Sequence, residues 1–272
     1  MNRRDFMNKS AAIAALGFTA EMTLMQRADA FEAVMAEGLT REVLKPPLLC
    51  NPEEARSMAP PGQAGPGGAA KQKLMAPMHD PRLIPMPEKP TLADFYRYRI
   101  PNPAHGLQSA KLAKDKGLSE KVILACLLHD ISVETLIRTD HGFWGAQLVA
   151  PYVDEEVSWA IQKHQTLRFF ADKSVGYDYP KKYKEWFGED YKVGSWIQKE
   201  YDEAKNHKWY MTARLITLND LYAFDPEMGE ISIDEFEGVI ARNFKQPKEG
   251  LGFDGSPSAH MWRTLIWPNS FL

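Results

Sequence analysis

An apolar segment that ends in two ionisable residues, LACLLHD from Leu124 to Asp130, constrains the fold of this chain more than any other stretch. The apolar run predicts a buried helix, and His129 and Asp130 lie side by side at its end. Burying both side chains without partners would cost several kcal/mol. The fold must therefore supply partners, and a metal ion would satisfy an imidazole nitrogen and a carboxylate oxygen together.

Other segments with helical periodicity surround this run and predict an all-α fold from about residue 91 onward. They cover residues 103–117, 119–132, 141–152, 154–170 and 209–226. Gly117 predicts the end of one helix, and Ser119 predicts the N-terminal cap of the next. No segment shows the alternation typical of a strand, and none reaches the roughly 18 apolar residues of a membrane span.

The composition is that of a globular protein and narrows the range of partners. The 272 residues are 44% hydrophobic and 25% charged, and the formal net charge is −3. Without a basic excess or a polybasic run, neither nucleic acid nor an anionic membrane is a predicted partner. The two cysteines, Cys50 and Cys126, cannot form a disulfide framework, so the fold must rest on packing.

The first 30 residues resemble a secretory signal peptide. Arg3 and Arg4 precede an apolar stretch at residues 11–20, and ADA at residues 28–30 offers a cleavage site before Phe31. The pair of arginines followed by Asp-Phe-Met resembles a twin-arginine signal, which predicts export of the folded protein to the periplasm or beyond. The alternative is an amphipathic N-terminal helix in a cytoplasmic protein.

The rest of the chain divides into two parts by composition. Residues 31–90 form an irregular Pro/Gly-rich extension, with SMAPPGQAGPGGAA at residues 57–70, and its His79–Asp80 pair is interpreted as a bystander. Residues 91–272 form the predicted helical domain with a C-terminal helical and aromatic extension. The last part, HMWRTLIWPNSFL, is aromatic enough to pack on the domain or on a second subunit, so a homodimer is a possible assembly.

Six candidate metal ligands lie on or beside the predicted buried helix faces: His105, His129, Asp130, His141, His164 and Asp220. His164 follows Val157 and Ile161 on one apolar stripe. Three or four of the six would suffice for one metal, whereas all six suit two metals that share a carboxylate. Adjacent helical residues point about 100° apart, which suits Asp130 between two ions while His129 binds one of them.

The order of these residues resembles the HD-domain superfamily over roughly residues 100 to 225. HGLQSAKLAKDKGLSEKVILACLLHDI is most similar to its opening two helices. The following HGFWGAQLVAPYVDEEVSWAIQKHQTLRFF is similar to the mixed-valent di-iron oxygenases, which include hydroxyalkylphosphonate-cleaving oxygenase and, more remotely, myo-inositol oxygenase. The resemblance implies an HD-domain helical bundle with two irons. By that resemblance, one iron is bound by His105, His129 and Asp220, the other by His141 and His164, and Asp130 bridges them.

The resemblance also implies an Fe(II)/Fe(III) pair that uses O2 to oxidise or cleave a small hydroxylated substrate. Arg168 stands where these oxygenases usually carry a lysine, and a guanidinium can hold a carboxylate, phosphonate or sulfonate. Tyr96 and Tyr98 are candidates for a gating tyrosine, but FYRYRIPNPAH offers no glutamate for a substrate amine. An anionic substrate is therefore expected. His207 and His260 have no counterpart in the motif.

Two other functions fit the same ligands. Other HD-domain proteins are metal-dependent phosphohydrolases that activate water, and in that case Mn, Ni or Zn would replace iron and Arg168 would hold a phosphate. A non-catalytic protein that binds metal or a partner is the third possibility. The ligand residues alone do not separate the oxygenase from the hydrolase.

Overall fold

The computed structural model describes residues 91–98, 100, 103–133, 140–188 and 191–245. In this part of the chain the regular structure is helical and no strand forms, so the all-α prediction is confirmed there. A single isolated antiparallel bridge, between Asp172 and Tyr177, is its one β-type pairing. The predicted signal peptide, the Pro/Gly-rich extension and most of the aromatic C-terminal extension lie outside the described residues.

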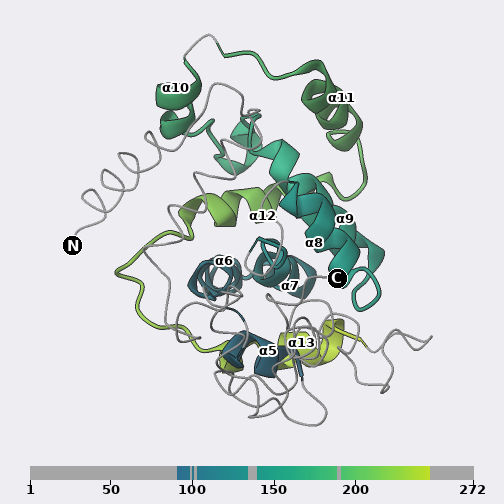
Figure 1. Cartoon of the computed structure of the whole chain (residues 1–272), viewed down its shortest axis with the longest axis vertical. Helices are drawn as coiled ribbons and strands as arrows, with labels where there is room; N and C mark the ends of the chain where they lie inside the picture. Colours follow the sequence, from purple (N-terminus) through teal and green to yellow (C-terminus); the bar gives the residue numbers. More distant parts are fainter. Residues whose placement is uncertain (1–90, 99, 101–102, 134–139, 189–190, 246–272) are drawn as a thin grey trace, which may run out of the picture.

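Two central helices are surrounded by the others (Figure 1). The helices are α5 (Leu92–Tyr98), α6 (Ala104–Asp115), α7 (Glu120–Leu128), α8 (His141–Val149), α9 (Glu155–Leu167), α10 (Lys181–Phe187), α11 (Ser195–Ala204), α12 (Tyr210–Tyr222) and α13 (Glu237–Asn243), with 3-10 turns η2 (Lys173–Val175) and η3 (Ile233–Phe236). In Figure 1, α6 and α7 lie at the centre, α12 crosses on one side, and α5 and α13 cover the other. The pair α8 and α9 packs beside α7 and α12, whereas α10 and α11 lie farthest from the centre.

The core forms around α7 because nearly all of its side chains are apolar. Every residue from Val122 to Leu128 is buried. Ser119 caps the helix by accepting a hydrogen bond from the Val122 amide at 3.4 Å, as predicted. The preceding Gly117 has a φ of 65°, a left-handed conformation that favours glycine and ends α6, also as predicted.

Glycines allow the backbones of neighbouring helices to meet close to the candidate ligands. A Cβ atom on Gly106 would lie 3.0 Å from the Leu127 carbonyl oxygen, and one on Gly142 would lie 3.0 Å from the Gln162 carbonyl oxygen. Real Cβ atoms rarely approach backbone oxygens so closely. Each glycine directly follows a candidate ligand, His105 or His141, so these close contacts bring both histidines against the neighbouring helix.

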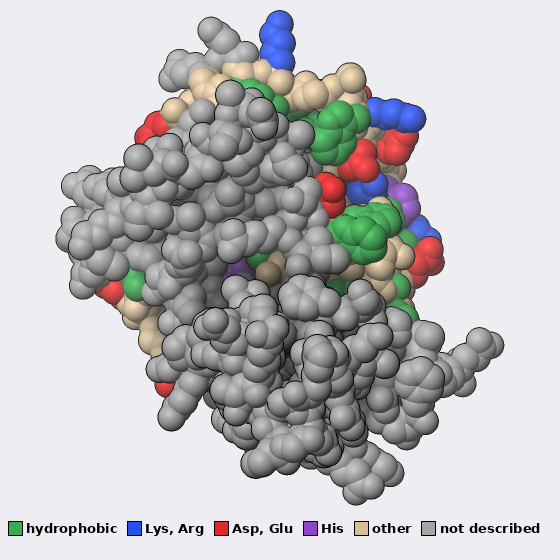
Figure 2. All heavy atoms as spheres, in the orientation of Figure 1, with side chains coloured by type: hydrophobic (Ala, Val, Ile, Leu, Met, Phe, Trp, Pro, Cys, Tyr) green, Lys and Arg blue, Asp and Glu red, His purple; other side chains and the backbone are tan. Residues whose placement is uncertain are grey.

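The surface of the described part mixes charge with apolar groups. Where described side chains are visible in Figure 2, acidic, basic and hydrophobic groups lie interspersed. Phe143 and Trp144 of α8 are exposed and contact each other edge to face. None of the helices in the described ranges is both long and apolar enough to cross a membrane.

Candidate metal centre

Five helices deliver the six candidate ligands to one buried place. His105 lies in the first turn of α6, His141 begins α8, His164 lies in the last turn of α9, and Asp220 lies near the end of α12. His129 is the C-terminal cap of α7, and Asp130 follows in the turn, so the pair stands at the end of the apolar helix. The four histidines are at most 1% exposed and the two aspartates at most 7%.

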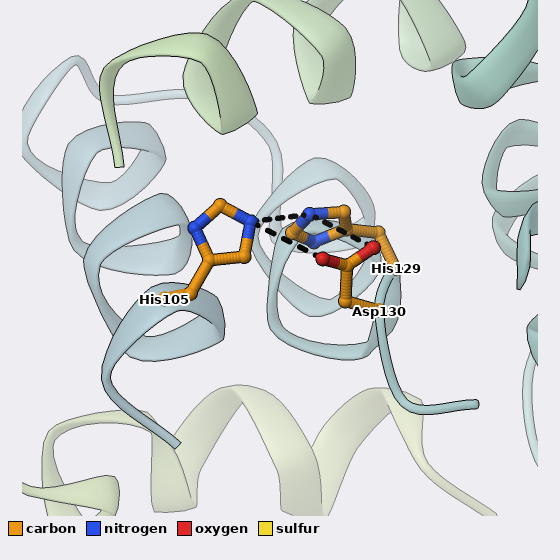
Figure 3. A group of neighbouring side chains, drawn as sticks. All are labelled: His105, His129 and Asp130. Atoms are coloured by element: carbon orange, nitrogen blue, oxygen red, sulfur yellow. Dashed lines mark hydrogen bonds and ion pairs between the residues drawn. The ribbon is translucent and has the colours of Figure 1, made fainter. Parts of the chain in front are cut away.

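One group of ligands forms around His105 and His129 (Figure 3). The two Nε2 atoms lie 3.1 Å apart. Oδ1 of Asp220 lies 3.1 Å from Nε2 of His105 and 3.7 Å from Nε2 of His129. Oδ2 of Asp130 lies 3.3 Å from Nε2 of His105. Two nitrogens and two oxygens from four side chains therefore converge on one point.

A second group forms around His141 and His164. Their Nε2 atoms lie 3.2 Å apart. Oδ1 of Asp130 lies 3.4 Å from Nε2 of His141 and 3.9 Å from Nε2 of His164. Asp130 thus turns Oδ2 toward His105 and Oδ1 toward His141, His129 and His164. A carboxylate in this position can bridge two ions.

The backbone fixes the tautomer of three of the four histidines. Nδ1 of His105 is 2.9 Å from the Ala223 carbonyl oxygen, and Nδ1 of His129 is 2.7 Å from the Cys126 carbonyl oxygen. Nδ1 of His164 pairs in the same way with the Ile161 carbonyl oxygen. A carbonyl oxygen only accepts, so each Nδ1 must carry the proton, and each neutral ring presents an unprotonated Nε2. Metal-binding histidines are held by this kind of hydrogen bond.

The charges around the centre keep most ligands in the form that binds a metal. Burial, with the positive charges of His129 and His141, lowers the pKa of His164 to about 3. Burial acts to raise the pKa values of Asp130 and Asp220, but the surrounding imidazoles outweigh it and lower both. Both carboxyl groups are therefore ionised and His164 is neutral at neutral pH, as metal coordination requires.

The pKa values of His105 and His129 are set by their burial and by the two carboxylates beside them. Burial acts to lower their pKa values, but the carboxylates of Asp130 and Asp220 raise both above the ordinary value. The negative charges of the two carboxylates thus stabilise positive charge on the groups between them. Protons on the imidazoles supply that charge, and a metal cation would supply it by replacing them.

The donor set fits a metal ion on geometric grounds. Oδ1 of Asp130 is buried and has no hydrogen-bond partner among the described residues, although three Nε2 atoms lie between 3.4 and 3.9 Å from it. Such distances lie at or beyond the upper limit for hydrogen bonds and suit atoms arranged around a cation. Three overlapping groups of ligand atoms lie within 4.8 Å: His105, His129 and Asp130; His129, His164 and Asp220; and Asp130, His141 and His164. Nitrogen and oxygen donors of this kind could hold iron, manganese, nickel or zinc.

Arg168 is buried at the end of α9, one turn after His164. It is the C-terminal cap residue and is 2% exposed, so it is not a surface residue. Its guanidinium carbon lies 5.3 Å from the centre of the Phe169 ring. This position places a permanent positive charge in the interior, on the helix that carries His164.

The two tyrosines predicted as gates lie on α5. Tyr96 is buried, and its hydroxyl donates a hydrogen bond to the Leu127 carbonyl oxygen, so it ties α5 to α7 near the ligands. It also lines a cavity of about 260 Å³ with Arg97, Leu107 and the segment 230–233. Tyr98 is half-buried. His207, which the motif left without a role, stacks on Trp159 at 4.0 Å between ring centres.

Sequence reasoning missed three residues that support the ligands. The Phe224 ring stacks on His105 with 4.2 Å between ring centres. The Thr217 hydroxyl lies within hydrogen-bond distance of the His164 carbonyl oxygen, at 3.0 Å. Arg214, on α12, is fully buried and donates to the Leu167 carbonyl oxygen at 2.9 Å. Thr217 was detectable, because it shares the apolar stripe of Asp220. A lone arginine in a helix gives no such signal.

In comparisons with known proteins, no family and no curated protein matches the chain. The geometry of the centre establishes a buried cluster of histidines and aspartates able to hold metal.

Proposed function

We propose that the cluster holds two iron ions and that the protein is an HD-domain oxygenase. It would use O2 to oxidise or cleave a small hydroxylated, anionic substrate. The observation that carries the proposal is Asp130, whose Oδ2 lies 3.3 Å from Nε2 of His105 while its Oδ1 lies 3.4 Å from Nε2 of His141 and 3.6 Å from that of His129. One carboxylate thus reaches histidines of both groups. A mononuclear centre needs only one such group. The choice of iron and O2 rests on the sequence resemblance to the mixed-valent di-iron oxygenases.

When bound, the two irons would supply the redox chemistry with O2 and a Lewis acid for the substrate hydroxyl. The residues of the chain would supply the rest. His105, His129 and His164 would keep Nε2 available because their Nδ1 protons bond to backbone carbonyls. The buried position of all six ligands would exclude bulk water and strengthen the electrostatic interactions inside.

Arg168 would bind the acidic group of the substrate. A buried guanidinium offers a carboxylate, phosphonate or sulfonate two parallel hydrogen bonds. Its place one turn after His164 would hold the anion on the side of the second metal. Tyr96 would gate entry only by breaking its hydrogen bond to Leu127, and Tyr98 would act beside it on α5.

The decisive experiment is the metal content of the full chain by elemental mass spectrometry, followed by activity screens. About two irons per chain, and O2 uptake with a hydroxylated carboxylate, phosphonate or sulfonate, are expected. Two manganese, nickel or zinc ions together with phosphoester hydrolysis would replace the oxygenase by the HD-type phosphohydrolase. No metal above the level of a chain carrying His105→Ala and His164→Ala would contradict both. His207→Ala is the matched control, because this histidine lies outside the cluster.

A further inference from the structure

Arg214 is a fully buried cation in α12 that the proposed chemistry does not use. Its side chain is 0% exposed. Its Nε donates to the Tyr210 hydroxyl at 3.2 Å, and its guanidinium carbon lies 5.0 Å from the centre of the Tyr177 ring. Removing a guanidinium from water costs several kcal/mol unless the surroundings repay it. Its position therefore requires specific compensation.

The chain that follows α9 supplies part of that compensation by folding back over Arg214, whose Nη2 is buried without a hydrogen-bond partner among the described residues. Oδ2 of Asp172 lies 3.6 Å from Nε of Arg214 and accepts a hydrogen bond from the Tyr210 hydroxyl at 2.7 Å. Tyr177, which pairs with Asp172 through the isolated bridge, donates its hydroxyl to the Arg168 carbonyl oxygen at 2.9 Å. We name Arg214, Tyr210, Asp172 and Tyr177 together the α9 cap.

The α9 cap acts on the last carbonyls of the helix that carries His164. Leu167 is the final residue of α9, and Arg168 is its cap residue. Carbonyls at a helix C-terminus have no partner within the helix and form the negative end of its dipole. Arg214 donates to the Leu167 carbonyl, which also accepts from the Phe170 amide at 3.1 Å, and Tyr177 donates to the Arg168 carbonyl. The cap thus fixes where α9 ends, one turn beyond His164.

The same face of α12 also fixes α9 at His164 itself. Arg214, Thr217 and Asp220 are spaced three residues apart, so they lie on one side of α12. The Thr217 hydroxyl lies 3.0 Å from the His164 carbonyl oxygen and 3.1 Å from the Ala213 carbonyl oxygen of its own helix, and it can donate to either. Arg214 donates to the Leu167 carbonyl oxygen. Beyond them, ligand atoms of Asp220, His164 and His129 lie within 4.8 Å of one another. The register of α12 on α9 therefore sets the distance between His164 and the ligands it faces.

We propose that Arg214 is a positioning residue for the His164 side of the metal centre. It holds the last turn of α9 in register with α12, and so keeps the His164 Nε2 in place for the second metal. This inference rests on the two-metal site and is independent of the reaction that the site performs. Loss of a residue that orients a metal ligand typically lowers metal affinity about 10- to 100-fold.

The test is a Co²⁺ titration of the metal-free full chain, read by visible absorption, with elemental analysis of the dialysed protein. His164→Ala and His105→Ala identify which binding step belongs to which side. Arg214→Met should weaken the step missing in His164→Ala by about tenfold or more and leave the other step unchanged. Arg214→Lys should restore part of the loss, because an ammonium can still donate to Leu167. Arg242→Met is the control, because that exposed arginine pairs with Glu120 on α7.

Unchanged Co²⁺ affinities in Arg214→Met, or equal weakening of both steps, would overturn the inference, even if the melting temperature fell. If Arg214→Met does not fold, Tyr177→Phe decides, because it removes one hydroxyl and keeps the ring over Arg214. Selective weakening of the His164 step in Tyr177→Phe supports the inference, and unchanged affinities refute it. A wild-type chain that binds fewer than two Co²⁺ ions would overturn the two-metal proposal as well. Two ions without any effect of these variants would overturn the positioning role alone.

Discussion

His164 is the ligand whose removal best separates the two metal positions. It faces His141 at 3.2 Å between Nε2 atoms, whereas His105 pairs with His129. Changing His164 to Ala should remove one of two bound metals and leave the helical fold intact. Elemental analysis and far-UV circular dichroism would measure both effects. Unchanged metal stoichiometry would show that His164 is not a ligand.

Arg168 should affect substrate binding more than metal loading. Charge-assisted hydrogen bonds contribute about 1.5–3 kcal/mol, so Arg168→Ala should raise KM for the best hydroxylated anion about 10- to 100-fold. The KM of Arg168→Lys should lie between those of the wild type and Arg168→Ala, because lysine keeps the positive charge but cannot donate two parallel hydrogen bonds. Steady-state O2 uptake and metal analysis of the same samples provide the measurement. Equal losses of metal and of substrate binding would indicate a structural role.

At the residue level, the sequence contained enough information to place the ligands but not their support. His164 and Asp220 could be assigned to buried faces because each lies three, four or seven residues from apolar residues of the same helix. Arg214 could not, because a charged residue between Ala213 and Leu215 is normally expected at the surface. Its burial depends on contacts with Asp172, Tyr177 and Tyr210. Contacts between α12 and the chain after α9 join residues far apart in the sequence, so they produce no periodic pattern around Arg214.

Between elements, the close approach of α8 to α9 depends on Gly142. A Cβ atom there would lie 3.0 Å from the Gln162 carbonyl oxygen and 3.1 Å from Cβ of Gln165. Overpacking of this kind typically costs about 1–3 kcal/mol. Gly142→Ala should therefore lower the free energy of unfolding by that amount and also weaken metal binding at His141.

The matched control for this prediction is Gly117→Ala. Gly117 has a positive φ of 65°, and a Cβ atom added to it would meet nothing within 4 Å, so only backbone strain opposes the substitution. A left-handed residue with a side chain costs about 1–2 kcal/mol. Denaturant unfolding should show comparable destabilisation in both variants, with Co²⁺ affinity reduced only in Gly142→Ala. Wild-type affinity in Gly142→Ala would show that this glycine serves packing alone.

The helices themselves were predictable to different degrees. The segments that became α6, α7, α8, α9 and α12 all showed apolar periodicity in the sequence. The peripheral helix α11 was missed although the sequence carried a signal for it, because Ile197, Tyr201 and Ala204 recur at helical spacing, and Tyr201 and Ala204 pack with the core. The repeated His-Gly pair, at residues 105–106 and 141–142, was a further signal in the sequence that the prediction did not use. Both pairs mark places where a ligand-bearing helix touches its neighbour.

For the molecule as a whole, stability should fall in acid partly through Asp172. Burial acts to raise its pKa, but hydrogen bonds from Ser174 and Tyr210 and the charge of Arg214 lower it below the ordinary value. A carboxyl group with a lowered folded pKa stabilises the fold above its unfolded pKa, about 3.9, and that contribution disappears as pH falls through the folded pKa. Urea unfolding of the chelator-treated protein should be measured at neutral and at acidic pH. The free energy of unfolding should therefore fall less between the two pH values for Asp172→Asn than for wild type.

Asp202→Asn provides the control for this pH dependence. Asp202 is exposed, and its hydrogen-bonded ion pair with Lys205 is screened by solvent. Its substitution should leave the acid sensitivity of the wild type nearly unchanged. If Asp172→Asn loses as much stability in acid as wild type does, other carboxyl groups account for the whole effect.

Export is a prediction for the intact chain that depends on Arg3 and Arg4. A reporter fused to residues 1–30 should reach the periplasm of a bacterial host, and changing both arginines to Lys should stop it, because the twin-arginine route requires the pair. Fractionation with reporter activity in each compartment is the measurement. Export that persists in the double variant would exclude the twin-arginine route, and failure of both fusions would exclude the signal peptide.

The buried thiol of Cys126 can report how often the helices around the candidate ligands separate transiently. The side chain is 0% exposed, its pKa is raised to about 12 by burial, and it lies one turn before His129 on α7. Alkylating reagents can therefore reach it only when the helices around the ligands separate transiently. In a Cys50→Ser background, the alkylation rate would report how often that separation occurs. The ratio of the alkylation rates without and with added metal ion would measure how strongly the metal suppresses this separation of the helices.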